Sequence, residues 1–436
     1  MAGALLNSLA ELPAPHLVDG ERRLDASEVE RLADTQAHDM QEGDWCPFVA
    51  TSTAESVLTF LACWRSGAVA APLHARLTPQ EQDEIRARVL ALPRERGLGV
   101  VLATSGSSGR PKIVRHTSPA LAYKAQLMVD VHGLTSDDVV LMPAPLAHVS
   151  GLLNGVLLPG AARMTTVLMQ RWSATDALNL IEREGVTFMI GPPTYFVQMM
   201  ADPSFSGDRV ASVRLISCGG AGVDALFARR AADAFGAVVK RTYGSTEAPT
   251  VTTSYAGDAA ELGWATDGRP VGDVELRIDS ETGELSVRGS ELFIGYDDRE
   301  ATNAVLSADG WFRTGDRATV TDGWLTVLGR IGETIIRGGE NVDPHEVEQV
   351  CAGLPDVGQV VVVGYPDEEM GERVGLVVVG REPTLAELRE HCAENGLARY
   401  KTPERILGVR EIPVLTVGKP DRATLREWLG SQRSST

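Results

Sequence analysis

The stretch GVVLATSGSSGRPK, residues 99–112, joins a short apolar segment to a loop of glycines and hydroxylated residues. Small residues let backbone N–H groups turn inward to bind an anion, and serine and threonine hydroxyls donate to phosphate oxygens. Lys112 adds a positive charge at the end of the loop. The loop differs from the Walker signature GxxxxGK[ST], because neither Ser nor Thr follows the lysine. A phosphate loop of another kind is one interpretation, and an ordinary turn is the other.

Helical patterns and β-branched segments alternate on both sides of this loop. Residues 52–67 predict a helix that begins at a Ser cap and ends at Gly67, and residues 69–73 predict a strand. A second helix, with a Thr cap and Pro at its first position, is predicted from residue 78. The same alternation recurs at 173–191 and 224–244. It predicts a layered α/β fold with a largely parallel sheet.

The pattern changes near residue 263. Short strands separated by Gly and Asp predict a more antiparallel β region at about 263–329. After it, helical and apolar β segments make up about 100 residues, which is enough for a small α+β domain. We therefore predict a large N-terminal domain, residues 1–329, and a small, mobile C-terminal domain, residues 330–436.

Composition excludes some classes of partner and site. Lys and Arg number 41 against 59 Asp and Glu, a net charge of −18, which argues against nucleic acid or an anionic membrane as the main partner. The five cysteines show no CxxC spacing, so neither a zinc site nor a disulfide framework is indicated. The N-terminal stretch has no basic segment before its apolar run. We expect a cytoplasmic protein without a membrane span.

Five further stretches follow the loop in a fixed order: YGSTEAP (243–249), GELSVRGSELFIGY (283–296), GWFRTGD (310–316), GRIGETIIRGGENVDPHEVE (329–348) and VGKPDR (417–422). Together with TSGSSGRPK they resemble the motifs of the adenylate-forming enzymes. This superfamily includes acyl-CoA synthetases, firefly luciferase and the adenylation domains of nonribosomal peptide synthetases. The resemblance extends from about residue 50 to residue 426.

The resemblance implies a reaction in which a carboxylate attacks the α-phosphate of ATP. Two anions must then meet, so the site has to neutralise charge and align the reactants. Lys419 would contact the carboxylate and the α-phosphate, Thr246 would contact the α-phosphate, and Glu247 would carry Mg²⁺. The phosphate cradle would consist of Thr104, Ser105, Gly106, Ser107, Ser108, Gly109 and Lys112. The remaining nucleotide contacts would be Gly219, Gly220, Ala221, Tyr243, Gly244, Asp316, which would accept both ribose hydroxyls, and Arg330, which would reinforce that contact.

A second half-reaction is implied, in which the small domain rotates and a thiol displaces AMP. Gly332 would be the hinge, because a hinge needs residues that absorb large φ/ψ changes. Gly338 and Gly339 would leave a narrow tunnel for the pantetheine of CoA. A simple hairpin turn is the alternative explanation of these two glycines.

The acyl pocket is expected around PLAHVSGLLNG, residues 145–155. His148 would point toward the carboxylate, although a lone histidine is also a common structural residue. Pro192 and Cys218 lie in two other stretches expected at this pocket. Leucines and valines follow His148 where peptide-synthetase relatives place an Asp that binds an amine, which favours an apolar acyl or aryl acid.

The leading hypothesis is an AMP-forming acid–thiol ligase that uses ATP, Mg²⁺ and CoA. The alternative enzyme passes the adenylate to a carrier protein, an amine or another nucleophile. A silent scaffold or nucleotide sensor is a third hypothesis, against which the retained Lys112, Glu247, Asp316 and Lys419 weigh. One departure from the family is the short stretch between residues 81 and 104, which would trim the periphery of the large domain. The motifs leave the identity of the acid and the oligomeric state open.

Overall fold

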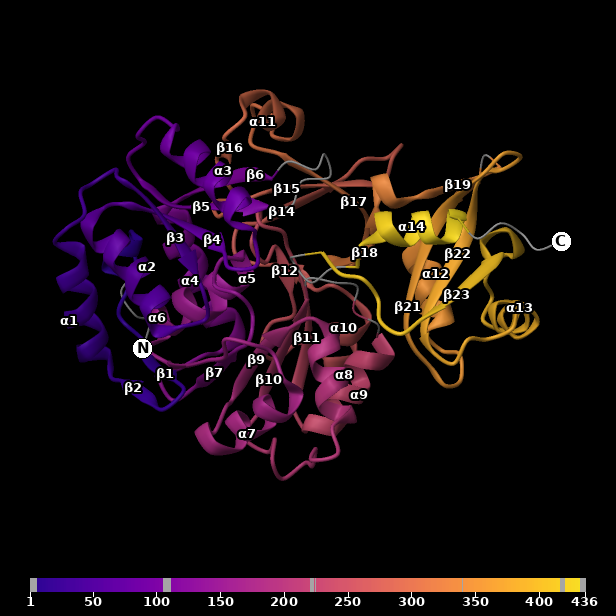
Figure 1. Cartoon of the computed structure of the whole chain (residues 1–436), viewed down its shortest axis with the longest axis horizontal. Coiled ribbons are helices and arrows are strands. Elements are labelled where there is room, and N and C mark those ends of the chain that lie inside the picture. Colours follow the sequence, from indigo (N-terminus) through magenta and orange to yellow (C-terminus); the bar gives the residue numbers. More distant parts are fainter. Residues whose placement is uncertain are drawn as a thin grey trace. The chain divides into compact units, whose positions relative to one another are not determined.

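The computed structural model (Figure 1) describes residues 6–104, 111–219, 223, 225–338, 340–415 and 420–431, without the side chain of residue 341. The chain forms two compact units. The N-terminal unit comprises Met1–Leu276, Ser286–Arg313 and Thr321–Leu325, and the C-terminal unit comprises Arg277–Leu285, Thr314–Val320 and Thr326–Thr436. The last segment of the C-terminal unit begins at Thr326, four residues before the predicted domain boundary at residue 330.

The largest sheet of the N-terminal unit has nine strands in the order β13-β12-β11-β10-β9-β7-β8-β1-β2. Its central strands pair in parallel, and antiparallel pairs occur only toward its two edges among the registers described. This confirms the predicted α/β class, in which parallel strands alternate with helices. The strands are β1 His16–Asp19, β2 Arg22–Leu24, β7 Val139–Met142, β8 Thr165–Leu168, β9 Phe188–Gly191, β10 Leu215–Gly219, β11 Val238–Tyr243, β12 Thr252–Thr253 and β13 Arg269–Pro270.

Helices connect these strands and bury their apolar faces against the sheet (Figure 1). α7 begins after the Ser173 cap and ends at Gly185, whose φ of 64° suits a glycine, as the sequence predicts. The helices of this part are α4 Ser118–His132, α5 Val149–Leu152, a π-helical turn Leu153–Leu157, α6 Leu158–Ala162, α7 Ala174–Glu184, α8 Pro193–Ala201, α9 Ala225–Phe235 and α10 Ala260–Ala265.

A second sheet of the same unit has the strand order β16-β6-β5-β4-β3. Strands β3 to β5 are parallel, whereas β5, β6 and β16 are antiparallel to one another in turn. α2 is capped by Thr53, one residue beyond the predicted serine, because the Thr53 side chain accepts the Ser56 N–H. The elements are β3 Trp45–Ala50, β4 Val69–His74, β5 Leu98–Thr104, β6 Lys112–Thr117, β16 Gly295–Tyr296, α1 Ala26–Ala37, α2 Ala54–Ser66, α3 Pro79–Leu90 and the short helix η1 Leu9–Glu11.

The predicted β region contains a four-stranded sheet whose strands have residues in both units. Its order is β14-β15-β17-β18. The elements are β14 Glu275–Ile278, β15 Glu284–Arg288, α11 Arg299–Val305, β17 Phe312–Thr321 and β18 Trp324–Arg330.

The rest of the C-terminal unit is a sheet of order β20-β19-β22-β21, with β23 on the other side of β22. Alternate residues of β21 and β22 enter two cores, so each face of the sheet is covered. Leu388 of α13 packs on one face and Leu425 of α14 on the other. The elements are η3 Ile331–Glu333, β19 Ile335–Arg337, β20 Glu340–Val342, α12 Pro344–Cys351, β21 Val357–Asp367, β22 Gly371–Gly380, α13 Leu385–Glu394, η4 Arg399–Lys401, β23 Arg405–Val409 and α14 Arg422–Ser431.

Candidate active site

The predicted phosphate loop joins the antiparallel strands β5 and β6. Thr104 at the end of β5 lies opposite Lys112 at the start of β6, and the Thr104 hydroxyl is 3.5 Å from the Lys112 carbonyl oxygen. The hairpin therefore brings two predicted phosphate contacts together at the end where the loop joins its strands. The other predicted members of the cradle, Ser105, Gly106, Ser107, Ser108 and Gly109, lie outside the described residues.

The predicted metal carboxylate, Glu247, lies in the loop 244–251 that returns β11 to β12. The loop turns tightly, because the Val251 N–H donates to the Tyr243 carbonyl at 2.8 Å. A Cβ at Gly244 would lie 2.4 Å from the backbone nitrogen of Thr250, so a side chain cannot fit there without moving the backbone. Glycine at position 244 is thus required by this close approach.

Three contacts hold Glu247 and connect it to the phosphate hairpin. Its carbonyl accepts the Phe293 N–H at 2.8 Å, and its Oε1 accepts the Tyr296 hydroxyl, also at 2.8 Å. The Lys112 ammonium lies 4.7 Å from the centre of the Tyr296 ring, a cation–π distance. One tyrosine therefore contacts both the predicted metal carboxylate and the predicted phosphate lysine.

A buried histidine holds the residue before Glu247. Nε2 of His116, on β6, is 2.7 Å from the Thr246 carbonyl oxygen, and the ring is fully buried. Burial lowers the pKa of His116 to about 4, although the bond to Thr246 and the charge of Glu247 oppose this. The ring is then neutral at pH 7 and donates its Nε2 proton to that carbonyl.

The donor set around Glu247 fits Mg²⁺ held jointly with phosphate oxygens. Mg²⁺ prefers oxygen ligands and is usually bound by one or two carboxylates together with substrate phosphates. Within the described ranges, no group of three His, Cys, Asp or Glu side chains could hold a metal on its own. Glu247 is half-buried, and its Oε2 has no hydrogen-bond partner among the described residues.

The end of β10 carries the predicted nucleotide shelf. A Cβ at Gly219 would lie 2.5 Å from the Thr242 carbonyl oxygen on β11, so the two strands approach closely there. The Cys218 side chain is fully buried in the core beneath the sheet, and burial raises the pKa of its thiol. This position favours packing over contact with a substrate. Gly220 and Ala221 lie outside the described residues.

His148, predicted for the acyl pocket, lies directly before α5, and its ring contacts that of His74 from the end of β4 at an interplanar angle of 41°. Their ring centres are 4.7 Å apart. The Arg76 N–H donates to Nδ1 of His74 at 3.0 Å, so a neutral His74 carries its proton on Nε2. Burial, followed by the charge of Arg76, lowers the pKa of His74 and favours this neutral form.

Pro192, the other acyl prediction, directly precedes α8. On this helix Tyr195 stacks on Trp172 with ring centres 4.0 Å apart. A Cβ at the preceding Gly191 would lie 2.6 Å from the Tyr195 ring. Burial raises the pKa of Tyr195, and the charge of Arg76 partly opposes this rise. The chain thus gathers aromatic rings and one cation around the segments expected to receive the acid.

In the C-terminal unit, the two residues predicted to bind ribose form an ion pair. Nε of Arg330 donates to Oδ1 of Asp316 at 2.9 Å. Asp316 is 8% exposed, and its own N–H donates to the Thr314 hydroxyl at 3.1 Å. The arrangement orients a carboxylate that has the acceptors needed for two neighbouring hydroxyls.

The predicted hinge and tunnel glycines occupy two different local structures. Gly332 is the middle residue of η3, and nothing lies within 4 Å of a Cβ built on it. Gly338 follows β19 with φ at 57°, and a Cβ there would lie 2.4 Å from the terminal carbon of Met370. The β19–β20 hairpin is thus a structural reason for Gly338. Gly339 and the predicted catalytic Lys419 lie outside the described residues.

Comparison with known proteins gives the family. Residues 88–297 match the family described as AMP-binding enzyme, and residues 346–419 match the C-terminal domain of that family. The indoleacetate–CoA ligase of Aromatoleum aromaticum is 34% identical over 355 residues, which are 77% of this chain and 69% of that protein. The chain belongs to the AMP-binding enzymes. This confirms the resemblance to adenylate-forming enzymes.

Two further similarities cover nearly the whole of this AMP-binding enzyme. A feruloyl-CoA synthase from an Amycolatopsis species is 31% identical over 92% of both chains. The structure of an amide bond synthetase from Marinactinospora thermotolerans matches 96% of this chain and 98% of that one, with a TM-score of 0.85 and 26% identity. The predicted fold class, with a large N-terminal domain followed by a smaller C-terminal domain, is confirmed.

Sequence reasoning missed several residues that contact the predicted site of this AMP-binding enzyme. Tyr296 ends the motif stretch 283–296 and His116 lies four residues beyond the phosphate-loop stretch 99–112, but neither received a role, because their partners are distant in sequence. His74 could have been suspected from its place shortly before a predicted helix, yet only its ring contact with His148 gives it a context. Glu291 lies within the motif stretch 283–296 and Lys124 lies outside the quoted motifs, but neither received a role, because each is paired with a residue distant in sequence.

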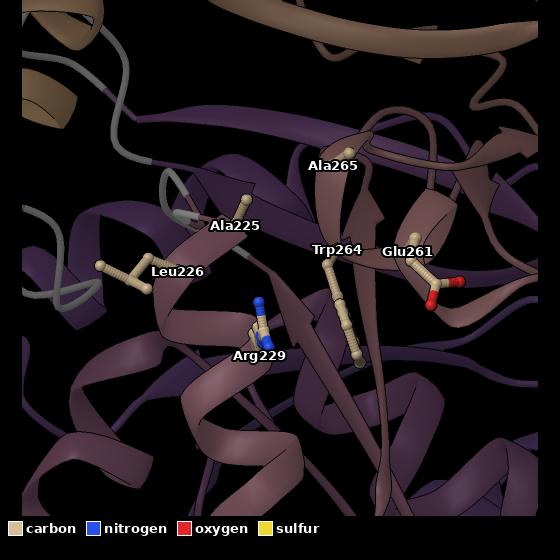
Figure 2. A pocket seen from close by; sticks show the side chains of 6 residues that line it. All are labelled: Ala225, Leu226, Arg229, Glu261, Trp264 and Ala265. Carbon is tan, nitrogen blue, oxygen red and sulfur yellow. The ribbon is translucent and has the colours of Figure 1, made fainter. Parts of the chain in front are cut away.

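Two cavities are formed by described residues of this AMP-binding enzyme. One of about 310 Å³ lies between α9 and α10, and Figure 2 shows Arg229 of α9 and Trp264 of α10 on facing sides of it. None of the predicted site residues lines it. A second, of about 410 Å³, is lined by Arg115, Arg299 and Tyr296, among other residues. Within the described part of the chain, no helix is long and apolar enough to cross a membrane.

Proposed function

We propose that this enzyme activates a carboxylic acid with ATP and then forms an acyl-CoA thioester. In the first step a carboxylate oxygen attacks the α-phosphorus, the bond to the β-phosphate oxygen breaks, and pyrophosphate leaves. In the second step the thiolate sulfur of CoA attacks the acyl carbonyl carbon and AMP leaves. The observation that carries this proposal is the contact of Tyr296 with both Glu247 and Lys112 in a chain of this family.

Charge neutralisation is the main demand of the first step. Lys112, with the hydroxyl of Thr104 beside it, would bind the β- and γ-phosphates. Glu247 would hold Mg²⁺, which supplies positive charge to the phosphate oxygens when it is bound. Thr246 would contact the α-phosphate, its carbonyl fixed by His116. Fixed donors and charges lower the barrier because they need no rearrangement as the transition state forms.

Nucleotide binding would continue in the C-terminal unit. The Asp316 carboxylate, oriented by Arg330, would accept the ribose hydroxyls. Lys419 would contact the carboxylate and the α-phosphate as negative charge develops. After adenylation, rotation at Gly332 would bring Gly338 and Gly339 to the pantetheine path.

We also propose an apolar acyl or aryl acid as the substrate. Apolar residues follow His148 in the segment expected to line the pocket, and they include Leu152 and Leu153. The stacked rings of Trp172 and Tyr195 add aromatic surface beside Pro192. The indoleacetate–CoA ligase and feruloyl-CoA synthase that this chain resembles act, by their names, on acids with aromatic rings.

A second acceptor is supported by one specific similarity. The amide bond synthetase matched over 98% of its length joins an acid to an amine, by its name, on the same fold. An acyl adenylate in this chain would then pass to an amine or to a carrier-protein thiol instead of CoA.

A cytoplasmic location is part of the proposal. It is supported by the five cysteines, which all lie in the described residues and are all free thiols.

The experiment is ATP–pyrophosphate exchange with a panel of aliphatic and aryl acids, with product masses measured when CoA is the only thiol. Acid-dependent exchange together with acyl-CoA formation supports the ligase. Exchange with persistent acyl-AMP supports another acceptor, which amines and a phosphopantetheinyl carrier protein in separate reactions distinguish. Absence of exchange across the panel would contradict both enzymes and favour a silent nucleotide-binding protein.

A further inference from the structure

The loop that carries Thr246 and Glu247 ends at a residue with an unusual backbone. Thr250 has φ at 45°, in the left-handed region, which β-branched side chains rarely adopt. Such residues persist only where the surroundings impose the conformation, and they occur most often at functional sites. The same residue makes the close approach to Gly244, since its nitrogen would lie 2.4 Å from a Cβ there. The shape of the whole loop therefore depends on Thr250.

Outside the loop, a buried lysine holds the carbonyl of Thr250. Nζ of Lys124, on α4, donates to the Thr250 carbonyl at 2.9 Å and to Oε1 of Glu291 at 3.0 Å. The side chains of Lys124 and Glu291 are both 0% exposed. Residue 291 lies between β15 and β16, so the pair ties three distant segments of the N-terminal unit together.

Burial of this pair is hard to explain as a gain in stability. Removing two charges from water costs free energy that their attraction often fails to repay, and apolar replacements of similar volume are often as stable or more stable. The pair is also incompletely bonded, because Oε2 of Glu291 is buried without a hydrogen-bond partner in the described part of the chain. Besides its ion pair with Glu291, Lys124 donates to the Thr250 carbonyl, and this contact suggests a role other than stability.

The other anchors of the loop act on its middle. His116 holds the Thr246 carbonyl and Phe293 holds the Glu247 carbonyl. Lys124 acts where the loop returns to β12, at Thr250, whose backbone is strained. Without it, Thr250 would relax toward an ordinary conformation and draw Gly244 and the carboxylate of Glu247 out of place.

We propose that Lys124 is a positioning residue for adenylation, because its buried ammonium holds Thr250 in the left-handed conformation that sets Thr246 and Glu247. Its effect on catalysis rests on the proposed function; its effect on the loop does not.

The test replaces the whole pair by apolar residues of similar volume, in the variant Lys124→Met/Glu291→Leu, so that no charge is left buried alone. We expect the midpoint of thermal unfolding to stay the same or rise, because no desolvated charge remains. We expect kcat for ATP–pyrophosphate exchange to fall about 10- to 100-fold, as misplacement of a reacting group by about 1 Å does. The KM for the acid should change less than twofold, since the residues expected to bind the acid lie in other segments.

Hydrogen–deuterium exchange of the backbone amides of residues 244–251, except Pro249, supplies a readout that does not require activity. These amides should exchange at least several-fold faster in the double variant. Adding Thr250→Gly should restore most of the protection and of kcat, because glycine adopts the left-handed region without strain. The matched control is Lys240→Met, which removes another buried lysine, one that donates to the Val131 carbonyl. It should leave loop exchange unchanged.

The outcomes separate the two ideas. If wild-type protein shows no acid-dependent exchange, the proposed function fails, and the loop amides alone decide the role of Lys124. Unchanged amide exchange at 244–251 in the double variant would overturn the inference, whatever the activity. The inference would also be overturned if the loss of kcat in the double variant matched its unfolded fraction. The same holds if adding Thr250→Gly restored none of the lost kcat.

Discussion

The phenol of Tyr296 donates a 2.8 Å hydrogen bond to Oε1 of Glu247. The two residues lie in separate motif stretches, and Tyr296 also presents its ring face to the Lys112 ammonium. The Glu247 carboxylate has one oxygen bonded, and its other oxygen has no partner in the part of the chain that the structure describes, so the group is oriented before any ligand arrives. A preoriented site costs less reorganisation during the reaction, so the hydroxyl of Tyr296 has a functional consequence that can be measured.

Tyr296→Phe removes that hydroxyl and keeps the ring beneath Lys112. We expect ATP–pyrophosphate exchange to fall about 10- to 100-fold, because the loss of a hydrogen bond to a charged group typically costs about 1.5 to 3 kcal/mol. The Mg²⁺ concentration for half-maximal exchange should rise. Tyr123→Phe is the matched control, since that hydroxyl contacts Asp273 at 3.4 Å instead. An unchanged Mg²⁺ dependence in Tyr296→Phe would show that Glu247 does not need this bond.

Gly244→Ala should abolish ATP–pyrophosphate exchange and lower the midpoint of thermal unfolding. The new Cβ would lie 2.4 Å from the Thr250 nitrogen and 2.9 Å from the Ala248 carbonyl oxygen, both backbone atoms that cannot rotate away. Gly207→Ala provides the comparison, because nothing lies within 4 Å of its Cβ position. Calorimetry and exchange assays on both variants check this. Wild-type behaviour of Gly244→Ala would mean that the loop moves freely enough to admit a methyl group.

Asp316→Asn tests the ion pair with Arg330. An amide keeps the size of the side chain but loses the charge and one acceptor, so ribose binding should weaken. We expect the KM for ATP to rise about 10- to 100-fold, the range for charged hydrogen bonds, with a smaller effect on the KM for the acid. Glu275→Gln removes a carboxylate from an exposed arginine pair and should leave both constants unchanged. Equal effects of Asp316→Asn and Glu275→Gln on the KM for ATP would contradict a role of Asp316 in ATP binding.

Stability should fall as pH rises above about 6.5, the ordinary pKa of His345. Burial alone would lower the pKa of His345, but its 2.8 Å bond to Glu348 and the charge of that carboxylate raise it. The stabilisation that His345 contributes is therefore complete below its pKa in the unfolded chain, and it is lost as pH rises through its raised pKa in the folded protein. For Glu348 burial is outweighed by His345 and Arg422, which lower its pKa, so its contribution is lost only in acid.

Thermal unfolding of the full chain from pH 5.5 to 8.5 measures this decline. In His345→Gln the slope attributable to His345 should disappear. His391→Gln should retain the decline, because the His391 ring bonds the Val350 carbonyl and no carboxylate. A decline of the same slope in His345→Gln would assign it to another group.

Lys419→Ala tests a residue outside the described ranges. Exchange should fall about 10²- to 10³-fold, the usual effect of losing a donor to developing negative charge. Formation of the thioester from supplied acyl-AMP should continue, because that step no longer involves the α-phosphate attack. Lys401→Ala, which removes a lysine paired with Glu346, should preserve both steps. Equal loss of both steps in Lys419→Ala would contradict the assigned role.

Local sequence sufficed to predict the fold class, and it also supplied most of the candidate residues that are proposed for the site. The alternation of helix and strand follows from apolar periodicity and caps, which are properties of neighbouring residues, as at Ser173 and Gly185 of α7. The motifs that contain Glu247, Asp316 and Lys112 are likewise continuous strings, readable without a structure. For the same reason the family and its general chemistry could be predicted before any contact was known.

Only the tertiary structure decided how those residues are held. His116 reaches Thr246 across 130 positions of sequence, Lys124 reaches Thr250 across 126, and Tyr296 reaches Glu247 across 49. No local pattern encodes such pairs, because burial and hydrogen-bond geometry depend on how separate segments pack. The sequence by itself determined which groups this enzyme has for its chemistry. The packing of distant segments determined which of those groups meet, which are charged, and which backbone positions are strained to hold them.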